Sequence, residues 1–363
     1  MDLDSLLQPI SEESPAGVDL RADMSPTSTY NTLKDARNSA RAAERKNVFD
    51  ASDNTALNHW KTVLEIAPTV SANETKDLEI TSWYIEALVR THGFEGLLQG
   101  FRVLKGLITQ YWDEVYPLPD EEGLETKVAS ITGLNGQGSE GVLIAPIRNI
   151  PITQGGGVDF ALWQYKQAVD IQKISDEKAR EERINATGFS MDDIQHAVRE
   201  TADTDVVMLK TTIAACLDEY RQISQLLDER CEELSPPTSN IINVLEDCTA
   251  AVNHLYKDRN IDVANDEQGE QPEEATESGG SSKSTQTRVG GPIKSREDAF
   301  QQILEISAFF RKTEPHSPVS YVLEKAVKWG RMPLDQLIPE LIADGSALEQ
   351  YKNLTGMNTN NED

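Results

Sequence analysis

Apolar residues recur at helical spacing along most of this chain, and this periodicity limits its fold more than any other feature. The stretches "LNHWKTVLEIA" (57–67) and "KDLEITSWYIEALVRTHG" (76–93) show it, and Gly93 is placed to end the second helix. The clearest stripe, with steps of four and three residues, consists of Leu97, Phe101, Leu104, Ile108 and Tyr111. Alternating patterns typical of strands are scarce. The sequence therefore predicts an all-α fold whose N-terminal helices enclose a core.

A second strong pattern predicts an antiparallel helical hairpin over residues 204–257. Pro236 and Pro237 end its first helix, and apolar residues return at the same spacing up to Leu255. The hairpin must bury its apolar seam, either against the preceding helices (158–185 and 190–202) or against a second copy of the chain. The sequence leaves both alternatives open. In the second case the dimer seam consists of Val206, Leu209, Ile213, Tyr220, Ile223 and Leu227.

Breaks in the periodicity divide the chain into four segments. A proline and three glycines in "NIPITQGGG" (149–157) place a boundary between a helical N-terminal domain (1–150) and a helical middle domain (158–257). Residues 258–292 are acidic, rich in Gly and Ser and nearly free of aromatic and branched apolar side chains. Such a composition cannot offset the entropy of ordering by burial, so these residues are predicted to be a disordered, flexible linker. A small helical domain, 293–363, follows.

The stretch "RKTEPHSPVSYVLEKAVKWG" (311–330) places an acid, an imidazole and hydroxyls between two prolines. The end of one helix and the start of the next explain this grouping without any chemistry. Pro315 cannot continue a helix, whereas Ser317 and Pro318 suit the N-cap and first turn of a new one, which Gly330 then caps. Catalysis would need a nucleophile, a base and an orienting group brought together by chance. We therefore predict no catalytic site here.

Three apolar helix stripes in about 70 residues give the C-terminal domain more apolar surface than so small a core can bury. The surplus is predicted to form contacts between copies of the chain. Head-to-tail association of identical domains gives a ring if the rotation closes. The candidate interface residues, among which the sequence does not separate core from interface, are Phe300, Ile303, Phe310, Val322, Trp329, Leu337 and Leu341.

Composition narrows the function classes. The chain has 34 basic and 61 acidic residues, a net charge of −27, so its average surface repels nucleic acid and anionic lipid headgroups. Its three cysteines have neither metal-site nor disulfide spacing, and its scattered histidines form no zinc ligand set. The N-terminus is acidic, unlike a signal peptide, and no apolar run reaches the roughly 20 residues that span a bilayer. We expect a cytoplasmic, non-enzymatic protein without cofactor, metal or membrane insertion.

Three stretches resemble one family. They are "PISEESPAGVDLR" (9–21), the succession from "HGFEGL" through "YWDEVYP" and "DEE" to "LN" within 82–135, and the C-terminal helices of 295–342. On these residues the chain resembles the TssA proteins of bacterial type VI secretion systems, whose N-terminal part is called the ImpA N-terminal domain. The short C-terminal part resembles the short type of this family rather than the long membrane-contacting type.

The resemblance implies a non-enzymatic assembly factor that contacts the baseplate and helps to initiate or guide polymerisation of the tube and sheath. It also implies a ring-like homo-oligomer formed by the C-terminal domain, with N-terminal domains that project on flexible connections and bind partners. Candidate docking residues around the acidic turn are Trp83, Phe94, Trp112, Asp120, Glu121 and Glu122. The alternative function is a dimeric cytoplasmic adaptor or chaperone that acts through the 204–257 hairpin.

Overall fold

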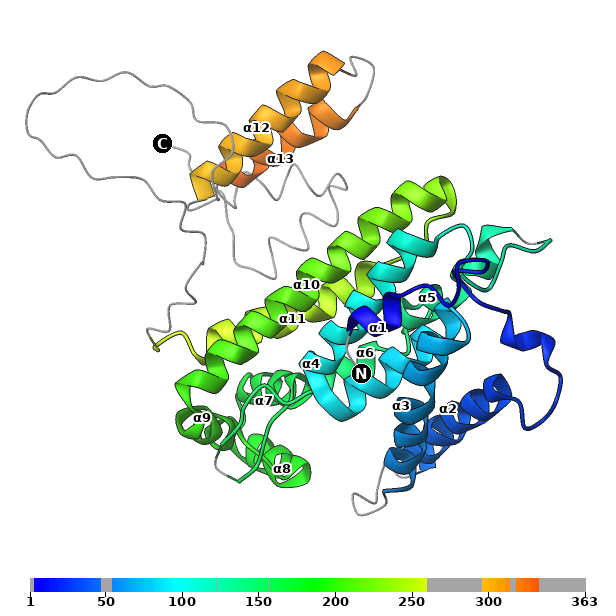
Figure 1. Cartoon of the computed structure of the whole chain (residues 1–363). Coiled ribbons are helices and arrows are strands. Elements are labelled where there is room, and N and C mark those ends of the chain that lie inside the picture. The colour runs from blue at the N-terminus through cyan, green and yellow to red at the C-terminus, as the bar shows by residue number, and fades with distance from the viewer. Residues whose placement is uncertain are drawn as a thin grey trace, which may run out of the picture. The chain divides into compact units, whose positions relative to one another are not determined.

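The computed structural model describes residues 3–46, 54–121, 123–155, 157–259, 296–313 and 318–332 (Figure 1). The chain divides into two units, 1–269 and 270–363. The helices of the first unit are α1 (Leu3–Leu7), α2 (Thr29–Lys46), α3 (Thr55–Asn73), α4 (Leu78–Tyr111), α5 (Leu124–Asn135), α6 (Ile144–Arg148), α7 (Leu162–Gln172), α8 (Glu177–Thr187), α9 (Met191–Glu200), α10 (Asp203–Cys231) and α11 (Ser239–Leu255), with short 3-10 turns η1 (Leu20–Ala22) and η2 (Glu232–Leu234). The second unit contains α12 (Arg296–Thr313) and α13 (Val319–Arg331). Within the described ranges β pairing is limited to isolated bridges, which confirms the all-α prediction.

The long helix α4 is the central element of the first unit. It is apolar on nearly all sides and packs against α2, α3, α5 and α10, as expected for a helix inside a core. Gly93 interrupts it with φ 57° and ψ −137°, a conformation that favours glycine, and the second half continues at once. The predicted helix end at Gly93 is therefore a kink within α4.

The predicted hairpin is present as α10 and α11. Its seam packs inside the same unit: α10 lies along α4, and the thiol of Cys216 donates to the carbonyl oxygen of Phe94 at 3.3 Å. One cluster of buried apolar side chains extends from Leu6 to Tyr256. The stretch 149–157, where the sequence places a boundary, thus connects two parts of one core, and the division into separate domains stays a prediction.

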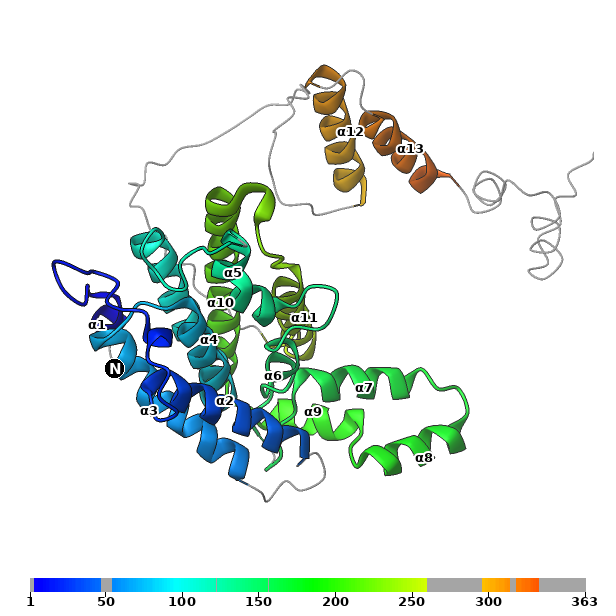
Figure 2. The ribbon, with the colours of Figure 1, turned by 90° about the vertical axis from the view of Figure 1, so that its right-hand side faces the viewer.

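The helices α2 and α3 form an antiparallel pair on one side of α4, as Figures 1 and 2 show. No helix was predicted from the sequence over the residues of α2. Its buried positions are Tyr30, Leu33, Ala36 and Ala40, two of them alanines. On the other side, α7, α8 and α9 extend from the body of the unit (Figure 2). No residue of α8 is buried.

The second unit is described as the antiparallel pair α12 and α13. The hydroxyl of Ser307 donates to the backbone oxygen of Ser320 at 2.8 Å, and the ring of Phe300 lies against Gly330. A Cβ at Gly330 would lie 2.5 Å from Cζ of Phe300, so this glycine makes room for the ring inside α13. The prediction that Gly330 caps the helix is therefore wrong. Residues 314–317 and everything after 332, including Leu337 and Leu341, lie outside the described residues, as does the linker from residue 260 onward.

Candidate functional site

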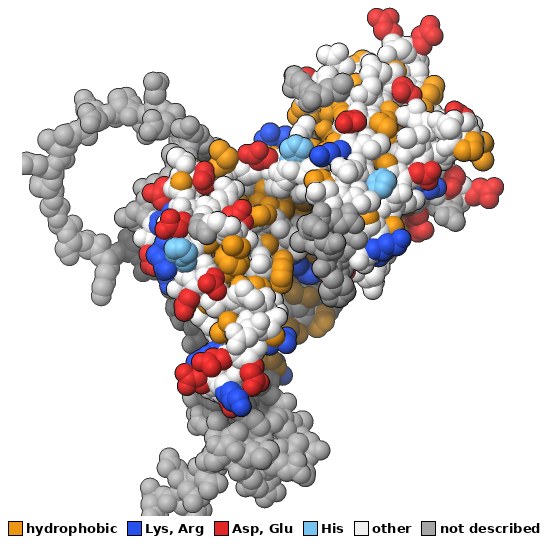
Figure 3. Space-filling model, turned by 90° about the horizontal axis from the view of Figure 1, so that it is seen from below, with side chains coloured by type: hydrophobic (Ala, Val, Ile, Leu, Met, Phe, Trp, Pro, Cys, Tyr) orange, Lys and Arg blue, Asp and Glu red, His pale blue; other side chains and the backbone are white. Residues whose placement is uncertain are grey.

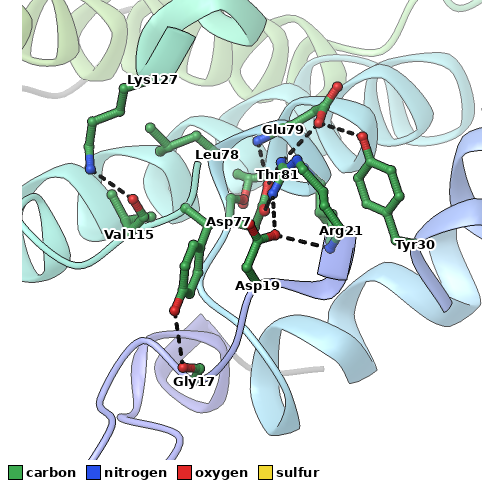
Figure 4. Close-up of polar contacts among 12 residues, drawn as sticks. Gly17, Asp19, Arg21, Tyr30, Asp77, Leu78, Glu79, Thr81, Val115 and Lys127 are labelled. Carbon is green, nitrogen blue, oxygen red and sulfur yellow. Dashed lines mark hydrogen bonds and ion pairs between the residues drawn. The ribbon is translucent and has the colours of Figure 1, made fainter. Parts of the chain in front are cut away.

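The start of α4 is fixed by a buried polar joint that accounts for the first motif, "PAGVDLR". The carboxylate of Asp77 caps α4 by accepting from the backbone N–H groups of Glu79 and Ile80 at 2.8 and 3.0 Å. Arg21 donates to Asp77 at 2.7 Å and to Glu79 at 2.9 Å (Figure 4). Burial alone would lower the pKa of Arg21, but these carboxylates outweigh it and raise that pKa above its ordinary value. The motif thus holds the N-terminal segment to the central helix.

Two further contacts complete this joint. The hydroxyl of Tyr30 donates to Glu79 at 2.9 Å, and burial together with that carboxylate raises the pKa of Tyr30 (Figure 4). Gly17 has φ 76°, and a Cβ there would lie 2.1 Å from the backbone oxygen of Glu74. Only glycine permits this close approach. The charged groups of the joint, Arg21, Asp77 and Glu79, are hydrogen-bonded to one another, to Tyr30 and to the start of α4. We therefore assign the joint a structural role.

The joint also positions the acidic turn after α4. The backbone of Tyr116 accepts from Leu78 N–H at 2.7 Å and donates to the oxygen of Lys76 at 2.9 Å. On the far side, Nζ of the buried Lys127 donates to the oxygen of Val115 at 2.8 Å, and burial lowers the pKa of Lys127 (Figure 4). The turn is therefore anchored at its start, while residues 118–121 are exposed.

Two of these exposed residues, Asp120 and Glu121, form one wall of a groove of about 1010 Å³, which we call the acidic groove. The other walls are α5 and the connection between α10 and α11. Its carboxylates are Asp120, Glu121, Glu125 and Glu233, and no Lys or Arg occurs among its described lining residues. Its apolar lining consists of Val128, Ala129, Leu234, Pro236 and Pro237. Carboxylates beside apolar side chains suit a basic segment that also carries apolar residues.

The connection that borders the acidic groove has an unusual backbone. Glu232 has φ 50°, a left-handed conformation that non-glycine residues seldom adopt. Leu234, two residues later, is 49% exposed although it is a large apolar side chain. The hydroxyl of Ser235 donates to Asp228 at 2.6 Å and so holds the connection to the end of α10. The groove is thus bordered by an ordered, partly apolar loop.

The structure corrects part of the predicted docking set. Trp83, Phe94 and Trp112 are 4, 5 and 8% exposed and belong to the core, because α4 is packed on all sides. Their rings support the fold and are not available to a partner. Asp120 and Glu121 are exposed and lie in the acidic groove, whereas Glu122 lies outside the described residues. Leu234, Pro236 and Pro237 were not predicted to belong to this site, because only the tertiary fold brings them close to the turn.

The predicted dimer seam is also corrected. Leu209 is partly buried, and the other five seam residues are fully buried within one copy of the chain, because α4 and α11 cover that side of α10. The seam that these side chains form is internal: Val206, Ile213, Tyr220, Ile223 and Leu227. The seam packs within one copy of the chain, but mainly against α4 and α11 rather than against the predicted partners, the helices at 158–185 and 190–202. Side chains buried in this way are not exposed to a second copy.

The predicted C-terminal interface residues fall into different environments. Phe300, Ile303, Phe310 and Trp329 are half-buried in the α12–α13 pair, while Val322 is 63% exposed. Four further exposed apolar residues of these helices were not among the predicted interface residues: Ile306, Phe309, Val319 and Tyr321. Among all described residues, five of the thirteen exposed large apolar side chains lie in α12 and α13. Exposed large apolar side chains are therefore concentrated in this short pair, among the described residues.

Other kinds of site find no support in the described residues. No group of three or more His, Cys, Asp or Glu side chains there could hold a metal ion, and Cys216, Cys231 and Cys248 are buried, unpaired thiols. Burial raises the pKa of Cys216 and of Cys248 to about 12, which is unfavourable for a reactive thiolate. No described helix is long and apolar enough to cross a membrane.

Comparison with known proteins places this geometry in a family. Residues 7–136 match the family described as "ImpA, N-terminal, type VI secretion system". The whole chain is similar to the type VI secretion system component TssA1 of Pseudomonas aeruginosa, with 24% identity over 98% of both proteins. The chain belongs to the TssA family. The match to the ImpA N-terminal family covers the joint, α4, the acidic turn and α5, so the acidic groove is built largely on the TssA N-terminal region.

A solved structure shares the fold of the first unit. It is the N-terminal domain, including the conserved ImpA_N region, of the TssA component of the type VI secretion system of Burkholderia cenocepacia. The TM-score is 0.58, with 24% identity, and the match covers 71% of this chain and 95% of that one. Because this match covers 71% of the chain, the shared fold includes more of the chain than residues 7–136.

Proposed function

We propose that this TssA-family chain is a non-enzymatic, cytoplasmic scaffold of a type VI secretion system. In this proposal α12 and α13 carry the contacts that join copies into a ring-like homo-oligomer. The first unit of each copy binds baseplate, sheath or tube proteins and helps to initiate or guide polymerisation of the tube and sheath. Similarity to TssA1 over nearly the full length supports the assignment to this system.

One observation carries the self-association part of the proposal. Ile306, Tyr321 and Val322 are 48, 60 and 63% exposed on two helices that bury little between them. Each fully buried aliphatic or aromatic side chain contributes about 1.5–3 kcal/mol, so covering several of them in each copy favours assembly. The net charge of −27 on each chain opposes random association and keeps unassembled copies in solution.

The docking part rests on the acidic groove. Each copy in an oligomer presents one such groove, so weak contacts with a repetitive partner gain strength from the high effective concentration. The groove's carboxylates favour a partner segment with Lys or Arg next to apolar residues. This proposal retains Asp120 and Glu121 as docking residues and adds Glu125, Glu233 and Leu234.

A test in the source bacterium uses a strain that lacks this chain and carries a fluorescent sheath protein. Restoration by the wild-type chain is compared with restoration by a double variant, Ile306→Glu with Val322→Glu. We expect the double variant to abolish sheath assembly, since charges would occupy the proposed interface. The control is Met24→Glu, which changes a side chain that is 85% exposed in the first unit. Normal sheath assembly with the double variant would contradict the proposal.

A further inference from the structure

The helix α2 carries an excess of basic residues on a strongly acidic chain, and Arg90 of α4 lies beside it. The helix α2 has Lys34, Arg37, Arg41, Arg45 and Lys46 but only two acidic residues. The three arginines recur every four residues, so they lie along one side of the helix. The net charge of the whole chain is −27, so the local positive charge of α2 is opposite in sign to that of the chain.

The carboxylates nearby do not neutralise these guanidinium groups. Glu86, which is buried, accepts from Arg37 at 2.7 and 2.9 Å, whereas Arg41 and Arg90 lie 3.9 Å from its other oxygen. Arg90 is engaged by Glu44 at 2.6 Å. Burial, together with the neighbouring guanidinium groups and despite Glu86, lowers the pKa of Arg41. Arg41 thus lies in a site with more cations than anions.

Arg45 adds a further cation to this cluster. Its side chain is exposed, and it forms no ion pair with any described residue. Glu44 is already bonded by Arg90 and by the indole N–H of Trp60, which donates to it at 2.7 Å. The Cζ atom of Arg90 also lies 4.5 Å from the centre of the Trp60 ring. Arg90 and Glu44 are therefore held in place, and Arg41 and Arg45 are the guanidinium groups that a ligand can reach.

These side chains form one wall of a second groove, of about 820 Å³, which we call the arginine groove. Arg41, Arg45 and Arg90 line it together with Glu44 and Trp60. Glu140, its other carboxylate, is paired with Arg148. Its apolar lining comes from Leu57 of α3 and from residues in and around α6: Val142, Ala145, Pro146 and Ile150. A lone anion needs no such apolar lining, and the volume greatly exceeds what one requires.

The groove also continues past the kink of α4. Gly93, Ile150 and Pro151 line both the arginine groove and an adjoining hollow of about 320 Å³ that includes Met208, a side chain 57% exposed. Figure 3 shows the underside of the molecule, where hydrophobic side chains gather in the middle of the face between areas of charged side chains. The pair of hollows gives an elongated surface with cations at one end and the carboxylates of Glu95, Asp159 and Asp205 at the other. Its shape suits a stretch of polypeptide whose acidic part lies at the arginine end.

We infer that the arginine groove binds an acidic segment of a partner protein, one that carries carboxylates beside apolar side chains. Two carboxylates of the segment accept from Arg41 and Arg45, whose planar guanidinium groups can each donate two parallel N–H bonds to one carboxylate. The apolar side chains of the segment lie on Leu57, Val142 and Ile150. This site is separate from the acidic groove and selects a partner of the opposite charge, so the first unit binds two chemically different segments.

The test measures binding of a fluorescein-labelled peptide of alternating leucine and glutamate pairs to the full-length chain by fluorescence anisotropy. A peptide with glutamine in place of glutamate serves as the ligand control. We expect binding of the glutamate peptide only, weakened between about 50 and about 300 mM salt by screening. Arg45→Glu and Arg41→Gln should each raise the Kd at least about tenfold. Arg183→Glu, the same charge change at an exposed position of α8, should leave the Kd within about twofold.

Four results would overturn the inference. The first is an unchanged Kd for Arg45→Glu. This result is decisive because Arg45 is exposed, so its replacement does not disturb the core. Equal weakening by Arg183→Glu would reveal only a general charge effect. Displacement of the peptide by inorganic phosphate at constant ionic strength would indicate a small-anion site. The last is a Kd at least about tenfold lower after six acidic residues of the chain are replaced by their amides, which would show that the chain's own acidic segment competes for the groove. The six residues are Asp262, Asp266, Glu267, Glu270, Glu273 and Glu274.

Discussion

The ring of Phe101 in α4 lies 4.7 Å, centre to centre, from the ring of Tyr220 in α10. Both side chains are fully buried. One belongs to the region that matches the ImpA N-terminal family and the other to the middle of the chain. Their contact helps to join the two regions into one core.

We predict that Phe101→Ala lowers the free energy of unfolding by about 3–5 kcal/mol, because it leaves a cavity between α4 and α10. Tyr220→Phe is the matched control. The Tyr220 hydroxyl is buried and has no hydrogen-bond partner among the described residues, so its removal should change stability by less than about 1 kcal/mol. Urea unfolding followed by both tryptophan fluorescence and circular dichroism should give one coincident transition for the first unit. Two separated transitions would contradict a shared core.

The polar joint gives a second prediction. Replacing Arg21 by Met leaves the buried carboxylate of Asp77 without its ionic partner, and the cost should be about 3 kcal/mol or more. Arg21→Lys keeps the charge but cannot contact Asp77 and Glu79 with the same fork, so it should fall between Met and wild type. The measurement is the urea midpoint of each variant. Equal stability of all three proteins would show that the joint is not a determinant of the fold.

The pH dependence of stability tests the buried Lys76. Its Nζ donates to the backbone oxygens of Leu6 and Ser71 at 2.8 and 2.6 Å, and burial lowers its pKa from 10.5 to about 8. Above this pKa the folded state releases a proton that the unfolded state still holds. The free energy of unfolding should therefore rise with pH between about 8 and about 10.5.

Lys76→Met removes this titrating group. The difference in free energy of unfolding between wild type and variant, measured from pH 7 to about 9.5, should increase steadily with pH above about 8. This window stays below the titration of the tyrosines, which lose protons at about pH 10 or higher. A difference that is independent of pH would mean that Lys76 titrates normally in the folded protein.

The acidic groove predicts salt-sensitive binding of basic segments. Exchanging Asp120 and Glu125 for lysine should weaken binding of a peptide of alternating lysine and leucine pairs at least about tenfold, because attraction becomes repulsion at two positions. The same exchange at Glu177 and Glu181, on the exposed helix α8, is the control. Isothermal titration of the full-length chain at two salt concentrations provides the measurement. Equal loss in both double variants would point to net charge alone.

The periodicity of the sequence was sufficient to predict the helical class and the α10–α11 hairpin, since long apolar stripes at helical spacing have few other solutions. It was less informative for α2. Two of the four buried positions in that helix are Ala36 and Ala40, small side chains that give a weak apolar signal although close packing against α3 buries them. An alanine stripe becomes meaningful only when its partner helix is known.

The candidate sites could be predicted only in part. The acidic turn is visible in sequence because Asp120 and Glu121 are local. The docking role given to Trp83 and Trp112 was wrong, because burial depends on how many neighbours surround α4. Three apolar residues of the acidic groove, Leu234, Pro236 and Pro237, come more than a hundred positions later, and the arginine groove joins α2, α3, α4 and α6. No local sequence pattern predicts such contacts between residues that are far apart in the chain.

The most direct test of the scaffold account is the mass of the full-length chain in solution, measured by size-exclusion chromatography with light scattering. The account predicts a single species whose mass is a fixed multiple of the 40.2 kDa chain and does not change with concentration in the micromolar range. The variant with Ile306→Glu and Val322→Glu should elute as a monomer with unchanged helix content. A wild-type chain that is itself a 40.2 kDa monomer under these conditions would contradict the account.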